Sequence, residues 1–264
     1  MPINGKYIHD FGIVRQYGEA MYKLTSINCY RQKGFEDDNR KFTAKGEAGN
    51  EGKLDNNVSR ATSRIFELAF CNPWEWYATL TLDPQKYDRT DLGQYIKDLS
   101  QFIRDFRKKT GNKVKYLLIP ERHQDGSWHM HGFFMGLPVG ELHAFTTTEH
   151  LPYHILKRLA DGIQVYTWGA YAQRFGYSCM ERIQNQEAVS KYITKYITKD
   201  TMRTITDLNA HAFYASKGLK SAEIIMQDML AKGISSPDYA NDYIAVKWYT
   251  EIQAALAHFE EVKA

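Results

Sequence analysis

The stretch ERHQDGSWHMHG, residues 121–132, decides the fold, because it predicts a β-hairpin that carries a cluster of metal-binding side chains. An Asp-Gly pair lies in its middle and a His-Met-His lies on its far side. Successive side chains of a strand point to opposite faces, so His129 and His131 share one face. Two neighbouring imidazoles are the beginning of a metal site.

The length of the hairpin loop determines which third side chain joins the histidines. A three-residue loop at 124–126, with Gly126 in the left-handed position of a G1 bulge, places Glu121 opposite His129. A two-residue Asp-Gly loop would instead place the cation Arg122 there. A metal site therefore predicts the odd-numbered loop, and two histidines with one carboxylate leave coordination positions open for catalysis.

The same stretch is also compatible with a purely structural role. It could be a buried hairpin with two hydrogen-bonded histidines, since short motifs often match by chance. If it does bind a metal, Asp83 at the end of the strand predicted at residues 74–82, and His123 on the same face as Glu121, are possible replacements or supporting partners for Glu121.

A second stretch, YITKYITK at residues 192–199, repeats one four-residue word. At 100° per residue its tyrosines and lysines lie along one side of a helix, beside a buried stripe that includes Val189. A tyrosine hydroxyl is a weak nucleophile at a pKa near ~10, but a neighbouring ammonium favours the phenolate and can hold a phosphate. An amphipathic helix with border tyrosines and no chemistry is the alternative.

Composition limits the class of protein. The chain has 264 residues and is 43% hydrophobic, enough for one large domain or two small ones. Its net charge of +3 means that any nucleic-acid surface is local. Cys29, Cys71 and Cys179 are far apart, which predicts neither disulfides nor a zinc site. With no apolar signal core and no run of 18 apolar residues, we expect a cytoplasmic protein without a membrane partner.

Hydrophobic periodicity predicts an α+β fold with a central, mainly antiparallel β-sheet and flanking helices. Strands are expected at residues 21–30, 74–82, 113–122, 127–136, 177–183, 211–216 and 243–249. Helices are expected at residues 57–70, between Asp91 and Gly111, after Pro152, and at residues 221–232 and 252–262, with residues 31–56 as a loop.

Capping residues delimit two of these helices. Asn57 or Ser59 is expected to cap the first, and Asp91 the second, which Gly111 ends. The cations at residues 107–109 fill the last turn of the second helix and suit its dipole without any ligand.

Four other cations are candidates for contacts to DNA phosphates. Arg60 and Arg64 lie four residues apart on one helix face, and Lys191 and Arg203 flank the tyrosine repeat. A solvated charged face is the alternative for the arginine pair.

Three blocks of this sequence resemble motifs of the HUH endonucleases, specifically rolling-circle replication initiators of small single-stranded-DNA phages and related plasmids. YATLTL at residues 77–82 resembles the first motif. The stretch from Glu121 to His131 resembles the metal motif, and residues 192–199 resemble the two-tyrosine motif. The metal motif precedes the tyrosines, which is the order in replication initiators.

The resemblance implies an HUH, ferredoxin-like core with the metal hairpin in the middle of the sheet and the tyrosine helix alongside. It also implies Mg²⁺ or Mn²⁺ as cofactor. The implied metal ligands are His129, His131 and Glu121. The implied nucleophiles are Tyr192 and Tyr196, assisted by Lys195 and Lys199.

The implied organisation has three parts. Residues 1–70 would be an N-terminal extension packed on the core, residues 71–217 the nickase core, and residues 218–264 a helix-strand-helix extension. Since no GxxxxGK[ST] loop occurs, no fused helicase is predicted, and a host helicase and polymerase are expected partners.

The implied activity is metal-dependent nicking of single-stranded DNA at a replication origin in a bacterial cell. The tyrosine would form a 5′-phosphotyrosine intermediate that a 3′-hydroxyl later reseals. Alternatives are a two-tyrosine transposase of the same chemistry, a non-catalytic single-stranded-DNA-binding module, and a small-molecule metallohydrolase.

Overall fold

The chain divides into two compact units, residues 44–219 and residues 1–43 together with 220–264. The computed structural model describes residues 7–19, 21–32, 51–185, 189 and 211–259, without the side chains of residues 51–59. Each unit has its own β-sheet. The boundaries drawn from the sequence, at residues 70 and 217, therefore differ from this division: residues 44–70 belong to the unit that contains the hairpin.

A seven-stranded sheet in the order β11-β6-β7-β5-β10-β9-β8 forms the unit of residues 44–219. Every strand pair in it is antiparallel, which confirms the predicted α+β fold. The hairpin of β6 and β7 lies next to β5 in the interior of the sheet. The strands are β5 (Trp76–Leu82), β6 (Lys115–Arg122), β7 (Trp128–Met135), β8 (Leu142–Ala144), β9 (Val165–Trp168), β10 (Gly176–Arg182) and β11 (Tyr214–Ala215).

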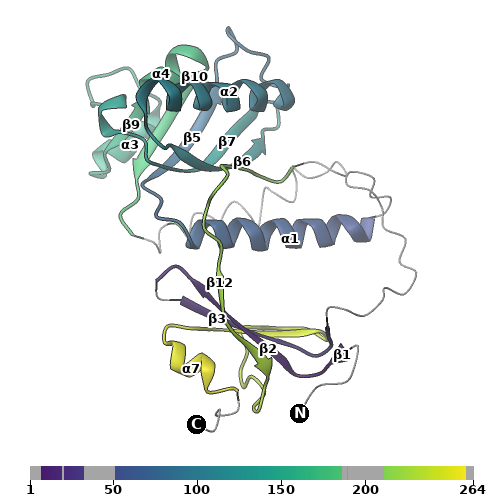
Figure 1. Ribbon diagram of the computed structural model, residues 1–264. Helices are drawn as coiled ribbons and strands as arrows, with labels where there is room; N and C mark the ends of the chain where they lie inside the picture. Colours follow the sequence, from purple (N-terminus) through teal and green to yellow (C-terminus); the bar gives the residue numbers. More distant parts are fainter. Residues whose placement is uncertain (1–6, 20, 33–50, 186–188, 190–210, 260–264) are drawn as a thin grey trace. The chain divides into compact units, whose positions relative to one another are not determined.

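Two hydrophobic clusters cover opposite faces of this sheet, and successive side chains of β5 point to them in turn. Trp76, Ala78, Leu80 and Leu82 belong to the larger cluster, which the buried side of α2 completes. Tyr77, between them, belongs to the other cluster, together with residues of α1. Figure 1 shows α2 lying across one face of the sheet. The helices are α1 (Glu51–Phe70), α2 (Leu92–Thr110), α3 (Tyr153–Ala160) and α4 (Gly169–Arg174), with a 3-10 turn η1 (Val139–Glu141).

The ends of the helices test the capping predictions. The Asp91 carboxylate accepts a hydrogen bond from the Gln94 amide at 2.9 Å, and Gly111 ends α2 with a φ of 73°, both as predicted. The caps predicted for the first helix are wrong, because α1 begins at Glu51 and Asn57 and Ser59 lie inside it. Its first turns are polar, so they lack the apolar periodicity from which the start was inferred.

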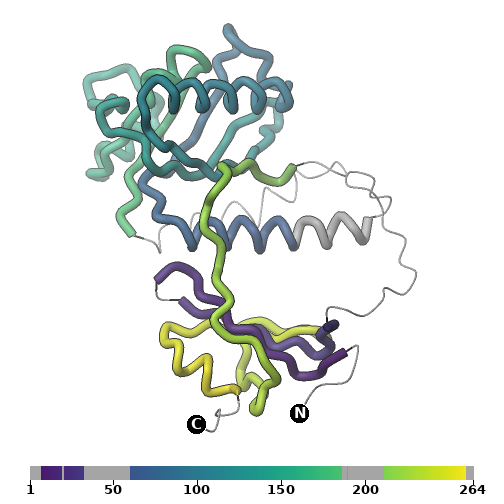
Figure 2. The backbone as a smooth tube through the Cα atoms, in the orientation of Figure 1, coloured from purple at the N-terminus to yellow at the C-terminus, as the bar shows by residue number. Residues whose placement is uncertain are grey.

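The second unit combines both ends of the chain in a five-stranded antiparallel sheet of order β12-β2-β3-β14-β13. Figure 2 shows the purple N-terminal strands beside the yellow-green C-terminal ones. Val14, Leu24, Ala255 and Phe259 form one of its buried clusters, and Ile8, Phe11 and Ile13 form another. The strands are β2 (Phe11–Tyr17), β3 (Met21–Ile27), β12 (Glu223–Met229), β13 (Tyr239–Ala240) and β14 (Ile244–Tyr249); β1 (Tyr7–Ile8) pairs with β4 (Tyr30–Arg31), and α7 spans Ile252–Leu256.

The helix predicted at residues 221–232 is wrong, since this segment is strand β12. Its pairing with β2 shifts register between Ile224 and Met226, which is a β-bulge or irregularity. The shift breaks the simple alternation that identifies a strand, so the apolar residues resemble a helical pattern. Hydrogen bonding to β2 overrides this local pattern. The extension is thus not helix-strand-helix.

The remaining predicted elements occur, with shorter bounds at several ends. The strand at 211–216 is reduced to the two residues of β11, and the helix predicted at 252–262 is reduced to α7. Strand β2 was not predicted. In the described part of the chain, no helix is both long and apolar enough to cross a membrane.

Candidate metal centre

The loop between β6 and β7 has the odd length that a metal site requires. The His123 amide donates to the Ser127 carbonyl at 2.8 Å, and the Gly126 amide donates to the His123 carbonyl at 2.9 Å. Gly126 has a φ of 85°, in the left-handed region. The loop is therefore residues 124–126, and the register places Glu121 opposite His129, as predicted.

Side chains and a neighbouring segment fix this loop. The Asp125 carboxylate accepts hydrogen bonds from the Ser127 amide and hydroxyl at 2.9 and 2.6 Å, and these bonds lower the pKa of Asp125. From the chain before α2, the Arg89 carbonyl accepts the Trp128 amide at 2.9 Å, and an Arg89 guanidinium nitrogen donates to the Ser127 hydroxyl at 2.9 Å. The hairpin thus presents its histidines from a rigid support.

Strand β5 supplies hydroxyl partners for both imidazoles. Its register places Thr81 opposite His129 and Thr79 opposite His131. The Thr81 hydroxyl lies 3.0 Å from His129 Nδ1, and the Thr79 hydroxyl lies 3.1 Å from His131 Nδ1. The Tyr77 hydroxyl lies 3.2 Å from the same His131 atom. When Nδ1 donates its proton to such an oxygen, Nε2 keeps the lone pair that binds a metal.

The Nε2 atoms of the two histidines have different surroundings. His131 Nε2 lies 2.5 Å from Glu121 Oε2. His129 Nε2 is shielded from solvent and has no hydrogen-bond partner among the residues that the structure describes. His123 stacks on His129 with ring centroids 3.9 Å apart, and its Nε2 lies 3.9 Å from Glu121 Oε2. A buried nitrogen with a lone pair and no donor nearby is typical of a ligand position.

Electrostatics favour the protonation states of Glu121 and His129 that can bind a cation. The hydrogen bond from His131 lowers the pKa of Glu121, with further lowering from the neighbouring imidazoles. Burial, together with the electrostatic effect of His123 and His131, lowers the pKa of His129 to about 4. At neutral pH Glu121 is therefore an anion and His129 is neutral.

The donor set fits a divalent cation, although the side chains are not spread around one. Among the described residues, no three histidine, cysteine, aspartate or glutamate side chains are arranged to hold a metal ion. Glu121 and His131 instead touch each other directly. The fit rests on the chemistry of one carboxylate and two imidazoles and on the buried His129 Nε2. Mg²⁺ or Mn²⁺ at this position stays a prediction.

The two alternative partners of Glu121 have different positions. His123 lies beside it, as its face parity predicts. The Asp83 carboxylate accepts the Gln85 amide at 2.9 Å and lies 3.9 Å from the Lys86 ammonium, so it stabilises the turn after β5.

The arginine pair proposed for DNA contact lies on α1. Arg60 is exposed, whereas the Arg64 guanidinium forms an ion pair with Glu67 one turn further along the helix. Arg60 is thus the more available of the two cations for a phosphate.

The tyrosine repeat lies outside the described residues, but the position of Val189 is known. Val189 is helical, buried, and packed in the same cluster as Tyr77 and Phe133. Tyr77 bonds His131, so this cluster adjoins the metal hairpin. The predicted site residues outside the described part are Lys191, Tyr192, Lys195, Tyr196, Lys199 and Arg203.

Sequence reasoning missed the role of the β5 hydroxyls. The alternation of Tyr77, Thr79 and Thr81 on one face was visible in the sequence. Their pairing with His129 and His131 depends on the register between β5 and β7, which are separated by α2 and β6 along the chain. Nothing local in the sequence specifies that register.

Comparison with known proteins gives one match. Residues 75–201 match the family model described as Replication-associated protein ORF2/G2P. This region begins two residues before the YATLTL block and ends two residues after Lys199, so it contains all three motif blocks. No curated protein and no solved structure matches the chain. Over just under half of its length, the protein is therefore similar to a family associated with rolling-circle DNA replication.

Proposed function

We propose that the protein is a metal-dependent nickase and strand transferase that acts on single-stranded DNA at a replication origin. The observation that carries the proposal is the arrangement of β5, β6 and β7. These strands place Glu121 and both histidines on one face, with hydroxyl partners at both Nδ1 atoms. The match of residues 75–201 to a replication-associated family supports it.

In this proposal His129, His131 and Glu121 hold Mg²⁺ or Mn²⁺. Thr79 and Thr81 would orient the rings through Nδ1 and so leave the Nε2 lone pairs for the cation. When bound, the cation polarises the scissile phosphate and neutralises the charge that develops on its oxygens.

The proposed nucleophile is the hydroxyl of Tyr192 or Tyr196. Its oxygen attacks phosphorus, a new O–P bond forms, and the bond from phosphorus to the 3′-oxygen breaks. The tyrosine proton is lost, and the departing 3′-oxygen takes up a proton to become a hydroxyl. The free 3′-hydroxyl later reverses the reaction, because the 5′-phosphotyrosine retains the energy of the original linkage.

The position of Val189 supports a place for these tyrosines near the hairpin. Val189 belongs to the same buried cluster as Tyr77, and the sequence pattern puts Tyr192 and Tyr196 three and seven residues further along one predicted helix. Lys195 and Lys199 follow each tyrosine by three residues, where an ammonium would favour the phenolate or hold a phosphate. A host helicase and polymerase in the bacterial cytoplasm belong to the same proposal.

A denaturing gel tests the proposal. The protein is incubated with labelled single-stranded fragments of its own replicon, with and without Mn²⁺, and boiled in detergent. We expect a metal-dependent, boiling-resistant band that is lost in His129→Ala and in the double variant Tyr192→Phe, Tyr196→Phe. The matched control is Tyr153→Phe, Tyr177→Phe, which alters two exposed tyrosines elsewhere.

Two results would contradict the proposal. An adduct that still forms in the double variant Tyr192→Phe, Tyr196→Phe would show that neither tyrosine is the nucleophile. Normal binding to the same fragments without any adduct favours a non-catalytic single-stranded-DNA-binding module. A transposase of the same chemistry would instead form its adduct on fragments that carry transposon ends.

A further inference from the structure

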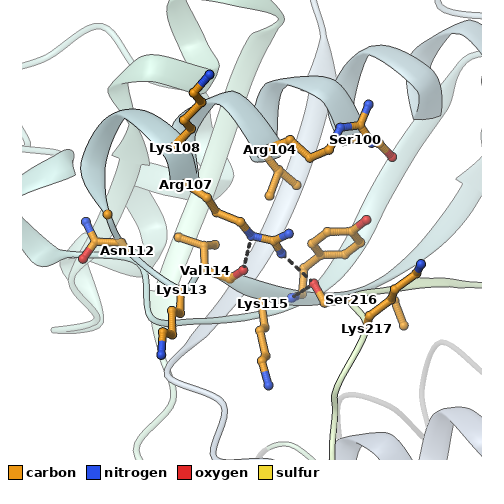
Figure 3. Close-up of a pocket in the computed structure, with 14 residues that line it drawn as sticks. Ser100, Arg104, Arg107, Lys108, Asn112, Lys113, Val114, Lys115, Ser216 and Lys217 are labelled. Atoms are coloured by element: carbon orange, nitrogen blue, oxygen red, sulfur yellow. Dashed lines mark hydrogen bonds between the residues drawn. The ribbon is translucent and has the colours of Figure 1, made fainter.

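A cleft of about 780 Å³ lies at the C-terminal end of α2, beside the start of β6 and at the other end of this strand from Glu121. The last turns of α2, the chain leading into β6, and the residues after β11 line it. Figure 3 shows Arg107 in its centre, with Lys108 extending on one side and Lys113 and Lys115 on the other.

The charge of this cleft has one sign. Among the residues that the structure describes, no acidic side chain lines it, whereas six cations do: Arg104, Arg107, Lys108, Lys113, Lys115 and Lys217. The nearby Asp105 carboxylate on α2 accepts a hydrogen bond from Gln101 at 2.7 Å and is not part of the lining. The helix dipole accounts for Arg107 and Lys108 at the end of α2, but not for the lysines of the other two segments.

Hydrogen bonds of Arg107 hold the three segments together. Its Nε donates to the Val114 carbonyl at 2.6 Å, and a terminal nitrogen donates to the Ser216 hydroxyl at 3.0 Å. The Lys115 ammonium donates to the Gly218 carbonyl at 2.6 Å. Arg107 and Lys115 are thus largely structural, and the exposed Lys108, Lys113 and Lys217 are available to a ligand.

The available lysines come from separate segments and extend in different directions, so they suit a chain of phosphates better than one small anion. We propose that this cleft binds the phosphate backbone of DNA at a distance from Glu121 and the two histidines. Lys115 and Glu121 are at opposite ends of β6, about 20 Å apart at ~3.3 Å per residue. That distance corresponds to about six base steps of a duplex at ~3.4 Å each. The inference takes DNA as ligand from the proposed function, but requires neither metal nor tyrosine chemistry.

Salt-dependent binding tests the cleft. The full chain is titrated, in EDTA, onto a fluorescent DNA hairpin with a single-stranded tail, and the dissociation constant is measured between about 50 and 300 mM NaCl, the range over which phosphate contacts weaken. The test variant is Lys108→Ala, Lys113→Ala, Lys217→Ala. The control variant, Lys97→Ala, Lys109→Ala, Lys157→Ala, removes the same charge from exposed lysines that do not line the cleft.

We expect the test variant to bind about tenfold more weakly, or worse, at about 100 mM NaCl. The slope of log K against log salt should become shallower by about two, since each phosphate contact contributes ~0.7 to 0.9. The control variant should stay close to wild type. Equal losses in both variants, or no loss in the test variant, overturn the inference.

The gel assay separates this inference from the proposed function. Weaker binding of the cleft variant, in a protein that forms no covalent adduct, supports the cleft and contradicts the nickase. An adduct in the wild type, with an unchanged salt slope in the cleft variant, supports the nickase and contradicts DNA binding by the cleft.

Discussion

The hydroxyls of β5 fix the histidines through Nδ1, so they should control metal affinity without touching the ion. Removal of an outer partner of a metal-binding histidine typically costs about 10–100-fold in affinity. We predict that Thr79→Val with Thr81→Val weakens Mn²⁺ binding by about tenfold to a hundredfold. Isothermal titration calorimetry measures the change.

The conservative exchange of the same two threonines is the control. Thr79→Ser with Thr81→Ser keeps both hydroxyls and should bind Mn²⁺ nearly as wild type does. If the valine and serine variants bind alike, the hydroxyls do not orient the rings.

His129 makes stability depend on pH in a defined window. Burial lowers its pKa from the ordinary value of 6.5 to about 4, so the unfolded chain takes up the proton first as pH falls. Its stabilising contribution is complete above ~6.5, declines as pH falls towards about 4, and declines no further below that. The pKa of Glu121 is lowered from the ordinary value of 4.5, so its protonation changes the stability only under more acidic conditions.

We therefore expect the melting temperature of the wild type, measured in EDTA, to fall more between about pH 7 and pH 5 than that of His129→Gln. Because the glutamine cannot be protonated, the variant lacks this source of pH dependence. Parallel curves for the two proteins in this range would show that the His129 pKa is not lowered in the fold.

At the scale of elements, the close approach of β6 and β7 depends on Gly132. A Cβ at this position would lie 2.0 Å from the Leu117 carbonyl oxygen, which is a backbone atom and cannot rotate away. We predict that Gly132→Ala destabilises the protein by ~3 kcal/mol, at the upper end of overpacking costs. Urea denaturation measures the free energy of unfolding.

Gly140→Ala is the control for this substitution, because no atom lies within 4 Å of its added Cβ. Its effect should stay within about 0.5 kcal/mol, as for most surface substitutions. If Gly132→Ala lowers the free energy of unfolding no more than Gly140→Ala does, then β6 and β7 can accommodate the added Cβ without loss of stability.

At the scale of the whole molecule, the unit built from both chain ends depends on its C-terminal strands. Strands β12 and β14 flank the β2–β3 hairpin on its two sides. An isolated hairpin is at best marginally stable. We predict that ending the chain at Leu219 exposes the amides of residues 11–27 to hydrogen exchange, while those of β5, β6 and β7 stay protected.

The full-length chain is the reference in that measurement. Protection of residues 11–27 that survives the truncation would show that the hairpin is stabilised by something other than β12 and β14. Loss of protection in β7 would show that the two units fold as one.

Local patterns determined much of this protein from the sequence. The loop at residues 124–126 and the face parity of the hairpin predicted Glu121 opposite His129, because hairpin register depends only on turn geometry and a period of two. Asp91 and Gly111 gave both ends of α2, because caps satisfy backbone groups within a few residues.

Only the tertiary structure decided what brings distant segments together. It placed Thr79 and Thr81 against the histidines, paired β12 with β2, and gathered lysines of three segments around one cleft. Each of these arrangements depends on hydrogen bonds or packing between residues far apart in the chain. Periodicity reports which face of an element is buried, but not which other element buries it.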